Sequence, residues 1–319
     1  MPDVSVIIVS YNTRELLRRC LQAVATHCAD LCCEIIVVDN ASQDDSAAMV
    51  ARDFPQVRLI ANRQNRMFAG ASNQGMAIAS ARSLLLLNSD AFVREATVQQ
   101  LLQFLDQHPR AAAVGPKVLN TDGSLQSKGF PAPRIGLGLV RVTGLNKCLP
   151  ERLKRRLFAR YFWDENTATM PDVLSGCCMM LRSSVVTEIG PLCEDFYHGG
   201  EDGEWCFRAR HAGYQVWFHP GSVVEHIGGA SKVRMDTTII LRDTVRAWET
   251  SFGLGYGIVA EALSTLYHVQ RLAAAWLTGK ARGTRTLIAD EVRLGGQKLA
   301  ALARRWWRGA AGACAGKET

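Results

Sequence analysis

Four acidic side chains stand where a carboxylate can do chemistry. Asp39 directly follows the apolar run EIIVV, and Asp90 follows the run SLLLLNS. At the end of a buried strand, a carboxylate is a hard oxygen ligand for Mg²⁺ or Mn²⁺, or an acceptor for a base N–H or a ribose hydroxyl. Glu201 and Asp202 follow two glycines, which allow the backbone to approach a ligand closely. A carboxylate there can act as a general base toward an attacking hydroxyl.

Each candidate also has a structural alternative. Asp90 could cap the helix that follows it, and Glu201 and Asp202 could stabilise a helix N-terminus through its dipole. With Glu204, however, that segment holds three acids in four residues, which is more than a cap needs. His226 stands shortly before two glycines, and its imidazole could complete a mixed oxygen and nitrogen metal site, although a lone histidine is more often structural.

The residues around these candidates alternate between buried strands and amphipathic helices. Continuous apolar, β-branched runs are typical of strands buried on both faces of a sheet. We expect strands over 4–10, 34–38, 57–61, 83–87, 113–119, 172–181 and 214–219, and helices over 13–27, 43–53, 72–82, 95–107 and 201–212. Because the first elements are joined by short connections, this order predicts a doubly wound, mainly parallel α/β sheet.

Polar residues recur where three of the predicted strands end. They are Ser10-Tyr11-Asn12, Asp39-Asn40 and Asn88-Ser89-Asp90. Ligands of open α/β sheets bind outside the carboxyl ends of the strands, so all three groups are expected at one crevice. No GxGxxG motif follows the first strand, which disfavours a dinucleotide-binding fold of the dehydrogenase type.

The composition is that of an ordinary globular protein. Of the 319 residues, 48% are apolar and 21% are charged, which excludes disordered, collagen-like and low-complexity classes. The ten cysteines are too dilute for a disulfide framework, and the first residues, MPDVSVIIVS, lack the basic region of a signal peptide. Reduced thiols and a cytoplasmic location are therefore expected.

The positive charge is concentrated towards the C-terminus. Residues 1–231 contain 23 Lys and Arg and 23 Asp and Glu, whereas residues 232–319 contain 14 and 7. The latter are expected to form a mostly helical basic extension, and its segment 304–308 (RRWWR) suits a membrane interface. We expect peripheral contact with the inner face of the cell membrane, the alternative being that these tryptophans pack on the core. No nucleic-acid motif accompanies the charge, so no nucleic-acid partner is expected.

Seven motifs, in order, resemble those of the family 2 glycosyltransferases. They are VSVIIVSYN, VVDNASQDDS, FAGASNQG, LLLLNSD, SGCCMMLR, GGEDGEWCFRAR and HIGGAS, and together they extend over about residues 4–231. Within the family, the chain looks most like the bacterial rhamnosyltransferase and galactofuranosyltransferase branch. The resemblance implies a GT-A fold for a domain over 1–231, that is, a Rossmann-like sheet flanked by helices, with a nucleotide half and an acceptor half.

The same resemblance implies an enzyme that transfers a sugar, with inversion, from a nucleotide diphosphate donor to a hydroxyl group. The acceptor would be a glycan or a lipid-linked acceptor in the synthesis of a cell-surface polysaccharide such as O-antigen or capsule. A divalent metal, Mg²⁺ or Mn²⁺, would assist, and rhamnose from its deoxythymidine diphosphate donor is the first expectation. Residues 129–171 are expected to form a loop or short helices over the site.

The resemblance also implies a role for individual residues of these motifs. The nucleobase and ribose would be contacted by Ser10, Tyr11 and Asp39, and the rest of the donor by Asn65, Asn73 and Ser89. Asp90 would be the remaining acid of the DxD-type metal motif, and His226 would help to hold the metal or the diphosphate. Asp202 would be the general base, with Glu201 beside it in the catalytic pair.

Two departures from the family pattern concern the donor side. Asn88 stands at the first position of the metal motif, which removes one charge, and Met67 replaces the glycine often found before Phe68. Two other function classes predict different sequence features. A nucleotidyltransferase would need a glycine-rich basic loop after the first strand, and YNTRELLRR has no glycine. A non-catalytic nucleotide-sugar or membrane-binding module predicts the loss of at least one candidate acid, and all of them are present.

Overall fold

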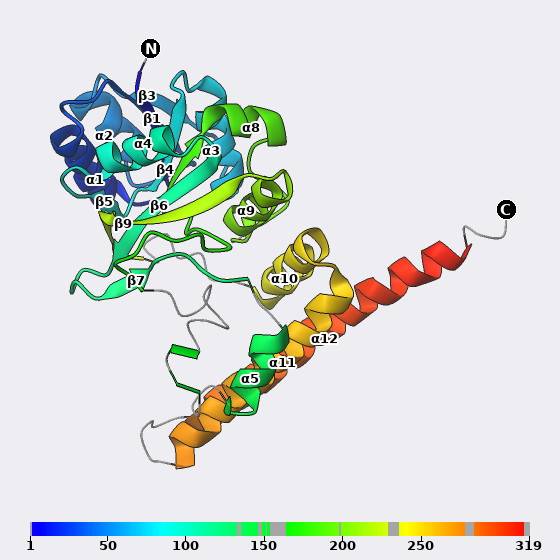
Figure 1. Ribbon diagram of the computed structural model, residues 1–319. Coiled ribbons are helices and arrows are strands. Elements are labelled where there is room, and N and C mark those ends of the chain that lie inside the picture. Colours follow the sequence, from blue (N-terminus) through cyan, green and yellow to red (C-terminus); the bar gives the residue numbers. More distant parts are fainter. Residues whose placement is uncertain are drawn as a thin grey trace. The chain divides into compact units, whose positions relative to one another are not determined.

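The apolar strands assemble into one nine-stranded mixed sheet (Figure 1). Its order is β3-β2-β1-β4-β8-β6-β9-β5, and β7 pairs with β6. This computed structural model describes residues 2–132, 135–145, 149–150, 152–153, 164–197, 199–228, 236–277 and 284–315. The sheet and its helices form one unit, Met1–Pro131 with Trp163–Arg234, and the other residues form a second unit.

The first half of the sheet is parallel. It comprises β1 (Val4–Ser10), β2 (Cys33–Asp39), β3 (Arg58–Ala61) and β4 (Ser83–Asn88), which are connected by α1 (Arg14–His27), α2 (Ser46–Asp53) and α3 (Met67–Ile78). The register places Ser10 opposite Asp39, and Val9 opposite Asn88. The polar ends of these strands therefore lie along one edge of the sheet, as expected from the sequence.

The second half adds antiparallel pairs. Strand β8 (Cys178–Arg182) runs antiparallel to β4 and to β6 (Ala111–Leu119), and β9 (Gln215–His226) runs parallel to β6. The short strands β5 (Ala91–Val93) and β7 (Leu125–Ser127) pair antiparallel with β9 and β6. Helices α4 (Thr97–Gln107), α8 (Ser183–Ile189) and α9 (Glu201–His211) complete the unit. The α/β fold class is confirmed, and the sheet is mixed.

The hydrophobic core occupies both faces of this sheet. On β1, Val6 and Ile8 belong to one buried cluster together with Leu17 of α1, whereas Ile7 between them belongs to a second cluster together with Trp205 of α9. Successive strand residues point to opposite faces, so a strand covered on both sides must be apolar at every position. This requirement explains the continuous apolar runs from which the central strands were predicted.

The strand expected over 172–181 begins only at Cys178. Two residues earlier, the backbone N–H of Gly176 donates to the carboxylate of Asp202 at 2.9 Å instead of joining a ladder between strands. The sequence pattern was strand-like in this stretch because most of its residues are apolar, but the N–H of Gly176 is bound to Asp202 and not to a neighbouring strand.

The strand expected over 214–219 is longer than the sequence indicated. It continues through Pro220-Gly221 and ends at His226. The pairing of β9 with β6 shifts in register between Pro116 and Lys117, as at a β-bulge. Residues 220–222 of β9 lie within this shift. His226 therefore belongs to the strand itself, which fixes the position of its backbone.

The second unit is helical in its described part. It comprises α5 (Ile135–Val142), α10 (Thr237–Ser251), α11 (Leu254–Leu277) and α12 (Thr284–Ala315). Trp248 of α10, Ala260 of α11 and Leu302 of α12 form its buried centre, and Trp248 Nε1 donates to Glu261 at 3.1 Å. Within the described residues, no helix combines the length and the apolar composition needed to cross a membrane.

One segment is grouped differently from the sequence-based domains. The second unit comprises Ala132–Phe162 and Met235–Thr319, so residues 132–162 group with the C-terminal helices, although the sequence had assigned all of 1–231 to one domain. Much of the segment 129–171, which was expected to form a loop or short helices over the site, lies outside the described residues, including 154–163.

Candidate active site

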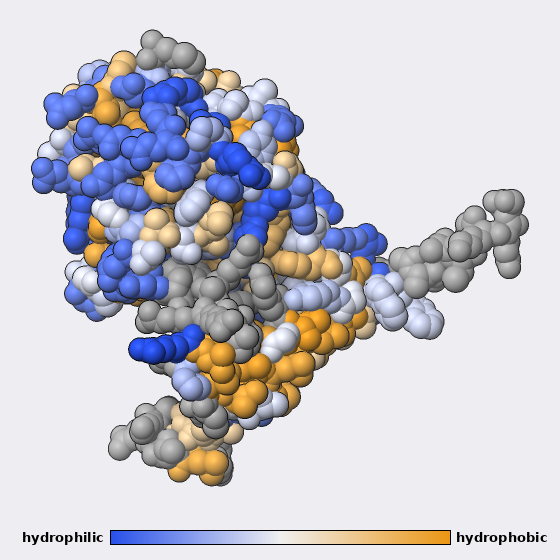
Figure 2. All heavy atoms as spheres, viewed as in Figure 1, coloured by the Kyte–Doolittle hydropathy of each residue, from blue (hydrophilic) through white to orange (hydrophobic). Residues whose placement is uncertain are grey.

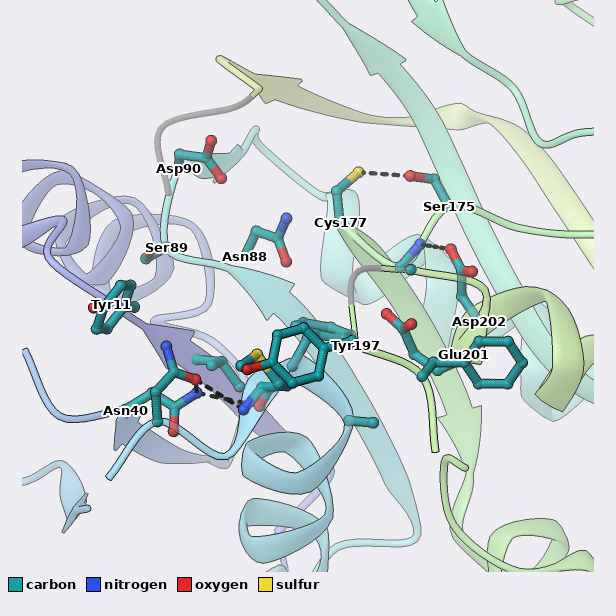
Figure 3. A pocket seen from close by; sticks show the side chains of 18 of the residues that line it. Tyr11, Asn40, Asn88, Ser89, Asp90, Ser175, Cys177, Tyr197, Glu201 and Asp202 are labelled. Carbon is teal, nitrogen blue, oxygen red and sulfur yellow. Dashed lines mark hydrogen bonds between the residues drawn. The ribbon is translucent and has the colours of Figure 1, made fainter. Parts of the chain in front are cut away.

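A pocket of about 350 Å³ opens beside the carboxyl ends of β1 and β4 (Figure 3). Seven of the ten residues assigned from the sequence line it, namely Tyr11, Asn65, Ser89, Asp90, Glu201, Asp202 and His226. Figure 3 shows Asp90 on one side of the pocket and the pair Glu201 and Asp202 on the other, with Asn88 and Cys177 between them. The pocket thus lies where parallel strands end, which is the usual ligand position in such sheets.

Strand pairing brings Asp90 and His226 together. Strand β5 begins directly after Asp90 and pairs with β9, so that Ala91 stands opposite His226. The N–H of Ile227 donates to the backbone oxygen of Asp90 at 3.1 Å, and His226 Nε2 lies 3.2 Å from Asp90 Oδ1. The His226 side chain is 13% exposed and that of Asp90 7%. A carboxylate and an imidazole from distant parts of the chain therefore face each other in the pocket.

This pair fits a divalent cation. Adjacent ligands of an octahedral ion bound at about 2.1 Å lie about 3 Å apart, close to the 3.2 Å between the Asp90 and His226 atoms. Among the described residues, no group of three or more His, Cys, Asp or Glu side chains could hold a metal. Two protein ligands leave the other positions for phosphate oxygens and water, which is a common way of binding Mg²⁺ in nucleotide sites.

The opposite wall presents Glu201 and Asp202 from the first turn of α9. Gly200 precedes this helix with a φ of 115°, a conformation that favours glycine. Asp202 accepts hydrogen bonds from the N–H groups of Gly176, at 2.9 Å, and Gly203, at 2.7 Å. In Figure 3, Asp202 is turned towards the backbone group that it binds, and Glu201 directs its carboxylate into the cavity.

Burial raises the pKa of Asp202 above the ordinary aspartate value, although its backbone hydrogen bonds act in the opposite direction. A carboxylate with a raised pKa binds a proton more readily, which suits a general base. Burial also raises the pKa of the Cys177 thiol to about 11, and the negative charges of Asp90 and Asp202 add to the effect. The thiol is therefore neutral near pH 7, a state in which it is a poor nucleophile.

Ser10 and Asn73 do not line the pocket. The Ser10 hydroxyl lies 3.0 Å from that of Thr13, which lies 2.8 Å from the hydroxyl of Ser89 on the pocket wall. Asn73 binds the backbone of Leu192 with both ends of its amide, donating at 2.9 Å and accepting at 3.0 Å. Ser10 therefore reaches the pocket wall through Thr13, and Asn73 binds the backbone of Leu192. Their contacts with the donor stay predictions.

Asp39 also lies outside the pocket lining, but one of its carboxylate oxygens lacks a hydrogen-bond partner among the described residues. The residue is 3% exposed and ends β2. Its Oδ2 accepts from the N–H of Ser42 at 3.0 Å, whereas its Oδ1 is buried and has no hydrogen-bond partner among the described residues. An unsatisfied buried carboxylate oxygen is costly, so Oδ1 requires a donor. A base N–H or a ribose hydroxyl would provide one.

Asn40 lines the pocket, as expected from its place at a strand end, but the sequence assigned it no role. It donates to Asn65 Oδ1 at 2.8 Å and to the Met67 carbonyl at 3.1 Å, and its Oδ1 accepts from the N–H of Arg66 at 2.8 Å. One amide thus holds the loop before α3, and its position directly after Asp39 was the available signal. The lining also includes Ser175, Gly176, Cys177, Phe196 and Tyr197, to which no role had been assigned.

Comparison with known families shows which family the chain is related to. The model of the family described as Glycosyl transferase family 2 matches residues 5–189, which is more than half of the chain. The chain belongs to this family. The resemblance drawn from the seven motifs is thereby confirmed.

Relatives of this family 2 glycosyltransferase include a low-salt glycan biosynthesis hexosyltransferase of Haloferax volcanii, 27% identical over 214 residues. That match covers 66% of this chain and 62% of the relative, so the chain spans less than two thirds of that protein. An N-acetylglucosaminyl-diphospho-decaprenol L-rhamnosyltransferase of Mycobacterium tuberculosis is 24% identical over 241 residues, covering 71% of this chain and 76% of the relative.

A solved structure supports the fold. It is a mannosyltransferase of Pyrobaculum calidifontis in complex with GDP-Man and Mn²⁺. It aligns with a TM-score of 0.53 at 18% identity, covering 96% of this chain and 88% of that one. At this level of identity the likeness concerns the fold, and the expected GT-A glycosyltransferase fold is confirmed.

The first residue of α3 has a strained backbone conformation. Met67 lines the pocket with a φ of 58°, in the left-handed region that favours glycine, at the position where the family often has glycine. We expect Met67→Gly to be more stable than Met67→Ala by about 1 kcal/mol, because left-handed backbone costs an L-residue about 1–2 kcal/mol. Urea unfolding of the two variants measures the difference. In an unstrained helix alanine is the better residue, so a more stable Met67→Ala would contradict the strain.

Proposed function

We propose that this chain is an inverting, metal-assisted glycosyltransferase that moves a sugar from a nucleotide diphosphate donor to a hydroxyl of a glycan or lipid-linked acceptor. The observation that carries the proposal is one pocket lined both by the neighbouring Asp90 and His226 and by Glu201 and Asp202. Figure 3 shows Asp90 across the cavity from the two acids of α9. A cation-binding pair on one wall and a base on the other suit the joining of an acceptor hydroxyl to a sugar whose diphosphate departs.

The donor side of the pocket would bind the nucleotide and its charge. Departure of a nucleoside diphosphate develops negative charge, which a bound Mg²⁺ or Mn²⁺ neutralises as a Lewis acid. Asp90 and His226 would hold the ion. Tyr11 and the loop fixed by Asn40 would border the nucleoside, and Asp39 Oδ1 would gain the hydrogen bond that it lacks.

Asp202 is the proposed general base. As the acceptor oxygen attacks the anomeric carbon, its proton passes to Asp202, and the bond from that carbon to the diphosphate breaks with its electron pair leaving on the phosphate oxygen. A single displacement inverts the configuration. Glu201 lines the pocket beside Asp202 and would orient the acceptor by accepting a hydrogen bond from it. A double displacement would need a nucleophile, and the neutral thiol of Cys177 is unsuited to that role.

The relatives suggest the class of substrate. One is named as a rhamnosyltransferase acting on N-acetylglucosaminyl-diphospho-decaprenol, which favours a deoxyhexose donor and a lipid-linked acceptor for this chain as well. Rhamnose from its deoxythymidine diphosphate is the first candidate donor, and a cell-surface polysaccharide is the product. Family membership disfavours the nucleotidyltransferase alternative.

The C-terminal region is the proposed contact with the membrane that carries such acceptors. Residues 232–319 hold the excess of basic residues, and Trp306 and Trp307 on α12 are 52% and 72% exposed instead of packed on a core. Exposed indoles next to arginines are suited to the interface of an anionic bilayer. The enzyme would then act in the cytoplasm, at the inner face of the cell membrane.

This contact can be tested with the full chain and vesicles of phosphatidylcholine and phosphatidylglycerol. We expect the double substitution Trp306→Ser and Trp307→Ser to reduce co-sedimentation at low salt, because two interfacial anchors are lost. Gln297→Ser, an exposed polar position on the same helix, is the matched control. Equal vesicle binding by the double variant and by Gln297→Ser would contradict the contact.

The base can be tested by isosteric substitution. We expect Asp202→Asn to lower turnover by a factor of about 10²–10⁴, the usual contribution of general base catalysis, while nucleotide binding is retained. Glu201→Gln should have a smaller effect. Glu204→Gln is the control, because Glu204 lies in the same helical turn, binds Arg208 at 2.7 Å and does not line the pocket. Near-normal turnover in Asp202→Asn, or a greater loss in Glu201→Gln, would contradict the assignment.

A further inference from the structure

We infer that Gln126 is a positioning residue that determines which ring nitrogen of His226 is presented to Asp90. The inference rests on the proposed function, in which His226 and Asp90 hold a divalent cation. A neutral imidazole carries one proton, and only the other nitrogen can bind a metal. The position of that proton therefore decides whether His226 is ready to act as a ligand.

Gln126 lies on β7 and contacts His226 at two points. Its Oε1 is 2.7 Å from His226 Nδ1, and its Nε2 donates to the backbone oxygen of His226 at 3.0 Å. A backbone carbonyl can only accept, so the second contact fixes the amide with its NH₂ group towards that carbonyl. The amide oxygen then faces Nδ1, and Nδ1 must be the protonated nitrogen that donates to it.

A chain of hydrogen bonds from the neighbouring turn gives the same orientation independently. Ser124 O–H donates to Asp122 Oδ1 at 2.6 Å, which leaves the Ser124 oxygen to accept from Asn120 Nδ2 at 2.9 Å. Asn120 must then present its Oδ1 to Gln126 Nε2, and the two atoms are 2.8 Å apart. Bonds from Ser124 lower the pKa of Asp122, so it is an ionised acceptor at neutral pH. Each hydrogen bond of this series therefore donates in the direction of Asp122.

The consequence appears at the other side of the imidazole ring. With the proton on Nδ1, His226 Nε2 presents a lone pair 3.2 Å from Asp90 Oδ1. Two acceptors at this distance repel each other, and a bound cation turns that repulsion into attraction. Hydrogen bonds to the outer nitrogen of a ligating histidine are known to orient the ring and increase its basicity. Gln126 would thus prepare the ligand before the ion binds.

Two substitutions separate this role from simple support of the turn. Gln126→Leu removes both contacts with His226. Gln126→Glu retains an acceptor for the Nδ1 proton but loses the two bonds that Gln126 donates, to the His226 carbonyl and to Asn120. We expect Gln126→Leu to weaken Mn²⁺ binding about 10–100-fold and Gln126→Glu to retain most of the affinity. A purely structural role predicts that both variants are equally impaired.

The measurement is the Mn²⁺ affinity of the full chain, followed by electron paramagnetic resonance of the free ion, alone and with UDP, dTDP or GDP. Gln99→Leu, at an exposed position of α4, is the matched control, and His226→Ala is the reference for a lost ligand. If Gln126→Leu binds Mn²⁺ as the wild type does while His226→Ala binds weakly, the role of Gln126 is refuted. If His226→Ala is unaffected, or the wild type binds no Mn²⁺, the metal site of the proposed function fails instead.

Nitrogen-15 NMR of His226 in the metal-free chain at pH 8 tests the orientation without metal or turnover. The expected result is a proton on Nδ1 in the wild type and in Gln126→Glu, and loss of that preference in Gln126→Leu. A proton on Nε2 in the wild type would overturn the inference.

Discussion

The short antiparallel pairing of β5 with β9 is the contact on which the candidate site depends. The chain turns back within two residues of the end of β4, and this turn places Asp90 directly before β5. The pairing then sets Ala91 opposite His226, so a residue near the middle of the first unit's sequence meets one near its end. Thr97 reinforces the pairing by donating its hydroxyl proton to the Val223 carbonyl at 2.7 Å. These bonds hold the carboxylate and the imidazole at the distance that the proposed cation site requires.

The second wall is held by different contacts, so the two halves of the site are anchored independently. Trp205 of α9 is fully buried, and its Nε1 donates to the Gly190 carbonyl at 3.0 Å. Arg210, at the other end of α9, pairs with the buried Asp172. These contacts fix the helix whose first turn carries Glu201 and Asp202. A fixed separation between the proposed cation ligands and the proposed base suits the single in-line displacement that we propose.

The sequence predicted the strand ends well and the contacts between them poorly. Residues 35–38, before Asp39, and residues 84–87, before Asp90, are apolar at every position. That pattern alone places the polar ends of the two strands at one edge of a sheet. Strand β5 has only three residues, too few for a recognisable alternation of apolar and polar residues. The proximity of Asp90 and His226 could therefore be expected only from the family resemblance. Asn73 could not be placed from the sequence, because an amide that binds Leu192 backbone looks the same in one dimension as an amide that binds a ligand. The contacts of Asn40 with the loop before α3, and of Gln126 with His226, could not be predicted for the same reason, because both join residues that are distant in sequence.

The most direct test of this account is calorimetric titration of the full chain with UDP, dTDP and GDP, each with and without Mn²⁺, repeated with Asp90→Ala. The account predicts that one nucleotide binds in a metal-dependent manner and that the substitution abolishes the dependence on metal, because Asp90 supplies the carboxylate at the diphosphate. Binding that is equally strong without Mn²⁺, or unchanged in Asp90→Ala, would contradict the assignment of Asp90 and His226 to the donor site.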